Sequence, residues 1–163
     1  MYKIPIIIGI FLLFFTFSAF ANGEGRERQE LFFVAPLVET IGYSDKTLAF
    51  GGGLSIGSGS GTAFGMRLLL AANPENFTFV EILFFMRLYI FGTNADTGPF
   101  VQINGGPVMY SDGRPEHSGF GNISAGLSGG WRFPLGESFF IEPAARVGFP
   151  YIAGIGVSSG YRY

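Results

Sequence analysis

The most hydrophobic segment beyond the N-terminal region, residues 77–91 (FTFVEILFFMRLYIF), contains two charged residues, Glu81 and Arg87. A transmembrane helix needs about 20 predominantly apolar residues, and each charge at its centre costs about 2.5–3.5 kcal/mol. In a β-strand, successive side chains point to opposite faces. Glu81 and Arg87 then share one face, and alternate residues from Val80 to Ile90 form a wholly apolar face. We therefore predict a strand with one charged and one apolar face.

The same alternation recurs in seven other segments of the chain. They are residues 30–41, 48–56, 61–70, 101–109, 120–133, 138–149 and 155–163. Clusters of Gly, Pro, Asn and Asp, which are typical of short turns, separate the segments at residues 42–46, 57–61, 73–76, 92–98, 111–119, 134–138 and 150–154. Because short connections join antiparallel neighbours, we predict an all-β fold, an eight-stranded antiparallel up-and-down barrel.

The polar face of these strands combines charged residues with small ones. The charged residues are Glu39, Arg67, Glu81, Arg87, Arg132, Glu142, Arg146 and Arg162. A soluble barrel would turn this face to water, but its remaining positions are mostly Gly and Ser rather than a solvated mixture of Lys, Glu and Thr. Small residues suit the narrow interior of eight strands. We therefore predict a transmembrane barrel with a polar lumen and a lipid-facing apolar exterior.

Aromatic residues on the apolar face gather near strand ends. Phe32, Trp131, Phe133 and Phe139 are expected to form an aromatic girdle at one rim, together with Tyr161 and Tyr163. Transmembrane barrels carry such girdles where the wall crosses the membrane interface. This placement supports the lipid-facing interpretation of the apolar face.

Charges enclosed in a narrow lumen are expected to pair. Simple hairpin registers place Arg67 diagonal to Glu81. They also place Glu142 diagonal to both Arg132 and Arg162. Diagonal neighbours lie about 7–8 Å apart, within reach of an arginine. Five arginines against three glutamates leave an inward positive excess, which polar side chains, water or an anion must balance.

The N-terminal region is typical of a secretory signal peptide. Lys3 supplies a positive start, residues 6–15 are apolar, and Ala19-Phe20-Ala21 is a small-x-small cleavage site. We expect a signal peptide at residues 1–21, a short N-terminal segment at 22–30 and the barrel at 31–163. An uncleaved anchor helix is the alternative.

The chain ends on an alternating strand whose apolar face carries Tyr161 and Tyr163. With the signal peptide and the eight strands, this terminal aromatic resembles the assembly signal of small bacterial outer-membrane β-barrel proteins of the OmpA/OmpX type. The resemblance covers the mature chain and is architectural, since no internal motif carries it. It implies both termini in the periplasm, contact with outer-membrane lipids, and recognition of the last strand by the barrel-insertion machinery.

Composition excludes several functional classes. Charged residues make up 13 % of the chain and the formal net charge is −2, so no basic excess exists to bind nucleic acid. The sequence has no cysteine, and His117 is its one histidine. We therefore expect no cofactor, no thiolate chemistry and no metal site built from a His or Cys cluster.

Three functions remain open from the sequence. The first is a non-enzymatic role in envelope structure, envelope integrity or surface contact. The second is a narrow, weakly anion-selective pore lined by the inward charges. The third is a lipid-modifying enzyme, for which the candidate residues are Glu116, His117 and Ser118. Adjacent residues in a loop rarely reach the geometry of a nucleophile and its base, so a solvated loop is favoured. The Gly- and Ser-rich run at 57–61 lacks the lysine and the helix of a phosphate-binding loop and indicates a hairpin turn.

Overall fold

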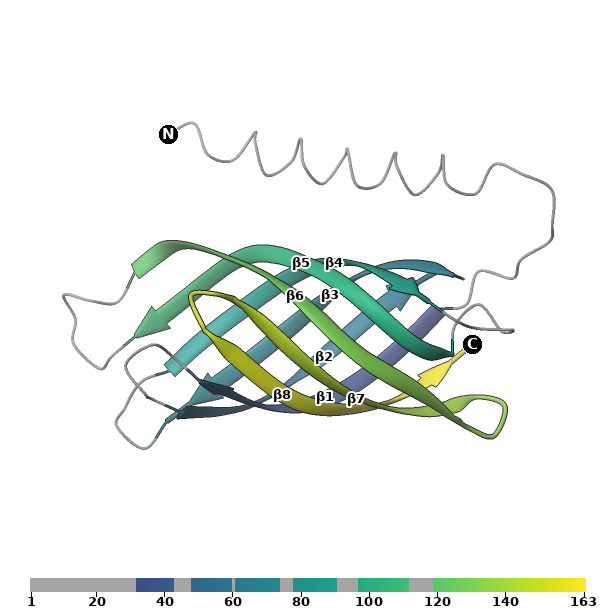
Figure 1. Ribbon diagram of the computed structural model, residues 1–163. Helices are drawn as coiled ribbons and strands as arrows, with labels where there is room; N and C mark the ends of the chain where they lie inside the picture. Colours follow the sequence, from purple (N-terminus) through teal and green to yellow (C-terminus); the bar gives the residue numbers. More distant parts are fainter. Residues whose placement is uncertain (1–31, 43–47, 60, 74–77, 91–96, 112–118) are drawn as a thin grey trace.

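A computed structural model of the protein describes residues 32–42, 48–59, 61–73, 78–90, 97–111 and 119–163. They form eight β-strands, β1 (Phe32–Gly42), β2 (Leu48–Ser58), β3 (Thr62–Ala72), β4 (Thr78–Tyr89), β5 (Gly98–Ser111), β6 (Gly119–Leu135), β7 (Phe139–Phe149) and β8 (Ala153–Arg162) (Figure 1). Each strand pairs antiparallel with the next, and β8 pairs with β1. The sheet is therefore a closed barrel, which confirms the predicted eight-stranded antiparallel up-and-down fold.

The expected signal peptide at 1–21 and the segment at 22–30 lie outside the described residues. Within the part of the chain that the structure describes, no helix is long and apolar enough to cross a membrane.

The described chain begins and ends at the same end of the barrel, here called the terminal end. The backbone N–H of Tyr163 donates to the carbonyl of Phe32 at 2.9 Å, which ties the last residue to the start of β1. The turn between β6 and β7 lies at this end, and the turn between β7 and β8 lies at the opposite, far end (Figure 1). The closing pair β1–β8 matches Phe33 with Arg162 and Leu37 with Ser158.

Strand boundaries follow the predicted segments with small differences. The run at 57–61 is a turn, because β2 ends at Ser58 and β3 begins at Thr62. Gly59 and Gly61 there have φ values of 133° and 76°, which few other residues adopt. The predicted turn at 134–138 begins too early, since β6 continues to Leu135. Pairing between β5 and β6 also contains a register shift between Val108 and Met109 that alternation alone does not indicate.

The two faces of the wall differ as the alternation predicts. Large apolar side chains point outward on every strand, among them Val38, Phe50, Leu70, Leu88, Val101, Leu127, Val147 and Ile155. Seven of the eight charged residues assigned to the inner face are buried: Glu39, Arg67, Glu81, Arg87, Arg132, Glu142 and Arg146. The eighth, Arg162, is partly exposed near the end of β8.

The interior also holds apolar side chains, in addition to the charged and small residues of the lumen. Phe33, Ala35, Ala63, Phe85 and Phe140 pack together near the terminal end. A second cluster near the far end contains Leu37, Ile41, Ala49, Leu69, Ala71, Phe79, Val108 and Tyr151. The charged residues thus share the lumen with an apolar layer toward each end.

Inward glycines make room for the inward phenylalanine rings. A Cβ added at Gly57 would lie 2.7 Å from the ring of Phe33, and one at Gly130 would lie 2.7 Å from the ring of Phe100. Both approaches are too close for a real Cβ contact. At these positions the inward ring therefore needs a neighbour without a side chain, because the bore of eight strands is narrow.

Candidate functional site in the barrel interior

The inward charges form two groups, and the first is centred on Glu142 of β7. Its carboxylate accepts hydrogen bonds from Arg87 of β4 through Nη1 at 2.7 Å and Nη2 at 2.8 Å. Arg132 of β6 donates to the same carboxylate from Nε at 2.8 Å. Arg87 also donates to Oε1 of Gln102 and, through Nη1 at 3.2 Å, to the hydroxyl of Tyr89. We call these residues the Glu142 group; it contains two cations and one anion.

The second group joins Glu39 of β1 to Glu81 of β4 through Arg146 of β7. Nη1 of Arg146 lies 2.7 Å from Oε2 of Glu81, and its Nε donates to Oε1 of Glu39. Arg67 of β3 pairs with Glu39 at 3.7 Å, and the hydroxyl of Ser124 donates to Glu81. This set, the Arg146 group, contains equal numbers of cations and anions.

Aromatic rings cover the guanidinium groups. The guanidinium carbon of Arg87 lies 4.0 Å from the ring centre of Phe100. The corresponding distance from Arg132 to Phe140 is 3.9 Å. A cation over a ring face is attracted by the ring quadrupole, more strongly where water is excluded. The inward rings therefore stabilise the same cations that the glutamates neutralise.

Tyr151 covers the Arg146 group at the far end. It lies in the turn between β7 and β8, yet its side chain is buried and its ring centre lies 4.0 Å from the guanidinium carbon of Arg146. A Cβ at Gly148 would come within 2.9 Å of its hydroxyl oxygen, so a side chain at that position would obstruct the ring. Burial raises the pKa of the Tyr151 phenol above its ordinary value. The sequence analysis did not predict this inward side chain, because Tyr151 lies in a turn, where strand alternation does not apply.

The pairing of charges differs from the sequence prediction in two places. Leu83 is opposite Arg67, so Glu81 lies diagonal to Arg67 as expected, but the described partner of Arg67 is Glu39. Arg162 was expected to pair with Glu142. Its Nε instead donates to the backbone carbonyl of Glu137 at 2.8 Å. Glu142 is opposite Ser158 in the β7–β8 register, four residues along β8 from Arg162. The simple register placed these two residues too close together.

The aromatic residues predicted to form a girdle lie at the terminal end. Ring centres are 5.9 Å apart for Trp131 and Phe133, and 5.0 Å apart for Phe139 and Tyr161. Phe32 and Tyr161 flank Tyr163, with ring centres at 6.2 Å and 4.7 Å respectively. Side chains from β1, β6, β7 and β8 thus form neighbouring aromatic contacts around this rim.

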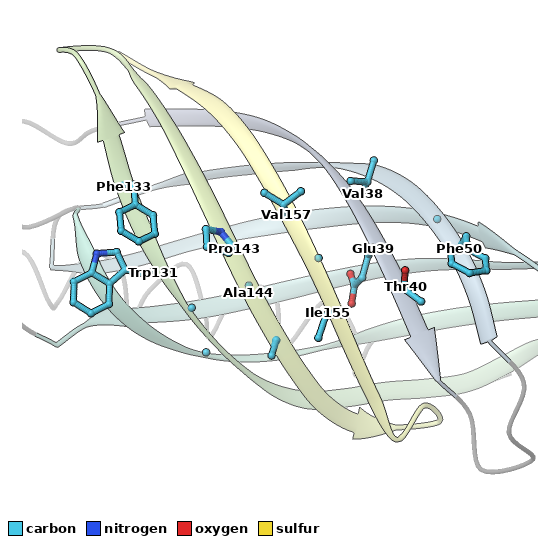
Figure 2. Close-up of a pocket in the computed structure, with 15 residues that line it drawn as sticks. Val38, Glu39, Thr40, Phe50, Trp131, Phe133, Pro143, Ala144, Ile155 and Val157 are labelled. Atoms are coloured by element: carbon cyan, nitrogen blue, oxygen red, sulfur yellow. The ribbon is translucent and has the colours of Figure 1, made fainter.

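One hollow is a shallow groove on the outer wall, of about 960 Å³, over β1, β2, β6, β7 and β8. Figure 2 shows Trp131 and Phe133 at one end of the groove and Phe50 at the other. The second hollow, of about 20 Å³, has lining residues from both charge groups, including Glu39, Arg67, Glu142 and Arg146.

Glu116, His117 and Ser118 lie outside the described residues, so the structure does not place the candidate enzyme residues. Among the residues it describes, no group of three or more His, Cys, Asp or Glu side chains is arranged to hold a metal ion. The side-chain interactions that the described barrel shows between its inward charges are ion pairs and hydrogen bonds.

No protein-family model matches the chain, and no curated protein sequence matches it. Solved structures do. The crystal structure of Neisserial surface protein A aligns over 82 % of this chain and 95 % of that chain, with a TM-score of 0.58 and 14 % identity. The N-terminal β-barrel domain of Pseudomonas aeruginosa OprF aligns over 83 % of this chain and all of that chain (100 %), with a TM-score of 0.57 and 12 % identity.

A structure from the de novo design of transmembrane β-barrels also aligns, over 86 % of this chain and 100 % of that chain. Its TM-score is 0.52 and its identity 11 %. At these identities the similarity concerns the fold, which agrees with the resemblance drawn from the last strand. The chain has the fold of the small eight-stranded outer-membrane β-barrel proteins.

Proposed function

We propose that the protein is an integral outer-membrane barrel without enzymatic activity that contributes to envelope structure and integrity or to a surface contact. One observation carries the proposal, namely that the barrel is apolar outside and charged inside. Outward Ile123, Leu127 and Ile155 are 72 %, 57 % and 68 % exposed, whereas Arg87 and Glu81 are 1 % and 0 % exposed. Water is a poor solvent for such an exterior, and a closed barrel satisfies its backbone polar groups within hydrocarbon.

The aromatic contacts at the terminal end also support a membrane environment for the outer wall. Trp and Tyr side chains have an apolar body and a polar tip, which suits the boundary between lipid and water. In this arrangement outer-membrane lipids cover the apolar wall. Export by the N-terminal signal peptide and insertion by the barrel-insertion machinery, through the strand that ends on Tyr163, belong to the same proposal.

The filled bore favours a structural role over conduction. Apolar side chains occupy the lumen toward both ends, and the ion pairs connect strands across it. The hollow between the charge groups measures about 20 Å³, about the size that holds one water molecule. A narrow, weakly anion-selective pore is the second candidate, favoured by the buried excess of arginine over glutamate.

A lipid-modifying activity is the third candidate and depends on the loop that contains His117. Loss of phospholipid hydrolysis in His117→Ala, with wild-type folding, would favour it. Absence of hydrolysis by the wild-type protein in outer-membrane lipid vesicles is the outcome that the non-enzymatic proposal expects.

Membrane fractionation with gel mobility before and after boiling tests the main proposal. We expect the chain, cleaved after Ala21, to leave the outer membrane only in detergent. We also expect it to migrate differently unboiled and boiled, because a closed barrel resists unfolding by detergent at room temperature. Recovery in a salt-soluble periplasmic fraction would contradict the proposal, as would an unchanged mobility on boiling.

A further inference from the structure

The small hollow inside the barrel has an unusual set of polar neighbours. Its volume is about 20 Å³, and its polar lining comes from Glu39, Arg67, Ser128, Glu142, Arg146 and Ser158. One water molecule needs about 10–15 Å³ by this kind of measure, so the hollow holds a single small species. A polyatomic anion such as sulfate or phosphate does not fit.

Two arginines that line this hollow have hydrogen-bond donors without acceptors. Nε of Arg67 and Nη2 of Arg146 are buried and have no partner among the described residues. The two residues are 7 % and 3 % exposed. A guanidinium group can donate but not accept, and a buried donor without an acceptor costs about 1–3 kcal/mol. Both donors therefore require an acceptor.

The carboxylates beside the hollow already have partners. Glu142 accepts from Arg87 and Arg132, and Glu39 pairs with Arg146 and Arg67. The hydroxyl oxygen of Ser128 accepts from Nδ2 of Asn104 at 2.8 Å, which leaves the Ser128 hydroxyl proton available to donate. Among the residues that line the hollow, the two buried polar atoms without a partner, Nε of Arg67 and Nη2 of Arg146, are both donors.

The net charge of the buried groups also favours an anion in the hollow. Among the described residues, four arginines (Arg67, Arg87, Arg132, Arg146) and three glutamates (Glu39, Glu81, Glu142) are buried. One positive charge is therefore left over in a medium where unpaired charge is costly. A water molecule would accept from the donors but would not neutralise that charge.

We propose that this hollow is a binding site for one small monoatomic anion of the halide class, held by Arg67 and Arg146 with the hydroxyl of Ser128. The anion accepts from both unpartnered donors and balances the extra positive charge of the adjoining Glu142 group, whose Glu142 lines the same hollow. It links β3, β6 and β7 through their side chains, so its binding stabilises the folded barrel. The site is independent of the membrane proposal, because it requires only the folded barrel.

Unfolding in different salts tests the site. The protein is folded in detergent micelles and unfolded by urea in sodium bromide or sodium gluconate at equal ionic strength. A single site predicts that, above the dissociation constant, the unfolding constant falls about tenfold for each tenfold rise in bromide. Gluconate is too large for the hollow and should give no such dependence. Equal unfolding constants in the two salts would overturn the proposal and indicate water.

A matched pair of variants locates the effect. Arg67→Met removes one donor and lowers the summed charge of the buried groups to zero, while Glu39 keeps Arg146, and it should abolish the bromide dependence. Arg162→Met, at the barrel rim, should retain it. Retention of the dependence in Arg67→Met would place the bromide effect elsewhere and overturn the site.

Diffraction at the bromine edge from wild-type crystals grown in bromide gives a test that needs no variant. An anomalous peak between Arg67 and Arg146 is the expected result. Peaks confined to the protein surface would mean an adventitious ion only and would contradict the proposal.

Discussion

Glu142 is the residue on which the Glu142 group depends. It is 3 % exposed, and three nitrogen atoms of Arg87 and Arg132 donate to its carboxylate. Arg87 reaches it from β4, a strand that is not adjacent to β7 in the sheet. The ion pairs therefore brace the barrel across its bore as well as along its wall.

Substitution of Glu142 by Gln should destabilise the folded barrel. Removal of the carboxylate charge leaves the buried guanidinium groups of Arg87 and Arg132 without their counter-charge. Removing one partner of a buried ion pair costs about 3–5 kcal/mol. Urea unfolding in micelles measures this change. Glu137→Gln, in the exposed β6–β7 turn, is the matched control and should have little effect. Similar free energies of unfolding for the two variants would show that Glu142 does not hold the cluster together.

Neighbouring glycines test the packing of inward rings. A Cβ at Gly130 would lie 2.4 Å from the carbonyl oxygen of Pro143 and 2.7 Å from the Phe100 ring, whereas a Cβ at outward Gly129 would have its nearest heavy atom at 3.8 Å. Gly130→Ala should therefore destabilise the barrel by about 1–3 kcal/mol through overpacking. Gly129→Ala should be nearly neutral. The comparison uses the temperature at which gel mobility changes, and a larger effect at Gly129 would reverse the assignment of faces.

At the scale of one strand, β6 tests which face meets lipid. Leu127 points outward and Ser128 points inward on the same strand. Leu127→Arg should cost about 2–4 kcal/mol if the residue lies near the bilayer midplane. Ser128→Thr keeps the hydroxyl inside and should cost much less. Folding titrations in lipid vesicles measure both, and equal costs would mean that lipid does not contact the Leu127 face.

Tyr163, which follows β8 directly, has two proposed roles, barrel closure and assembly signal, and a single experiment can separate them. Tyr163 bonds to Phe32 through its backbone and touches two rings through its side chain. Tyr163→Ser keeps the backbone bond and removes the ring. If the ring acts as the assembly signal, the amount inserted in the outer membrane falls while export is unchanged.

Tyr163→Phe is the control for this experiment, because it preserves an aromatic ring at the end of the chain, and it should insert normally. If the Tyr163→Ser variant inserts to the same amount as the wild-type protein, the ring is not an assembly signal, and barrel closure is the remaining role of this residue.

For the whole molecule, the filled lumen predicts poor conduction. The wild-type protein should show no large, stable current steps in planar bilayers, and any leak should be weakly anion-selective because buried arginines outnumber glutamates. Large stable steps would instead support the pore.

Tyr151 provides a variant for the same recordings. Tyr151→Ala removes the buried ring that covers Arg146 at the far end, so leak events should become more frequent. Ile152→Ala, a neighbour that is 58 % exposed, should behave like the wild type. An equal rise in both variants would mean that the turn, and not the ring, limits passage.

Much of the barrel could be predicted from the sequence, because strand alternation is a local property. Two-residue periodicity assigns each side chain to a face without knowledge of its neighbours. Glu81 and Arg87 in an otherwise apolar segment were therefore enough to indicate an inward polar face on β4. Turn-forming residues between eight such segments indicated an up-and-down order. The observed strands differ from the predicted segments at some of their ends, such as the end of β6.

Only the tertiary structure decided which side chains meet inside the barrel. Closure curves the sheet, so β4 and β7 face each other across the lumen and Arg87 reaches Glu142 although no hairpin joins them. The same closure turns Tyr151 inward from a turn and sets inward glycines beneath phenylalanine rings. The sequence by itself determined the faces and the number of strands, because alternation is local. The partners of its charges were decided by closure, because contacts across a bore depend on the register of all eight strands together.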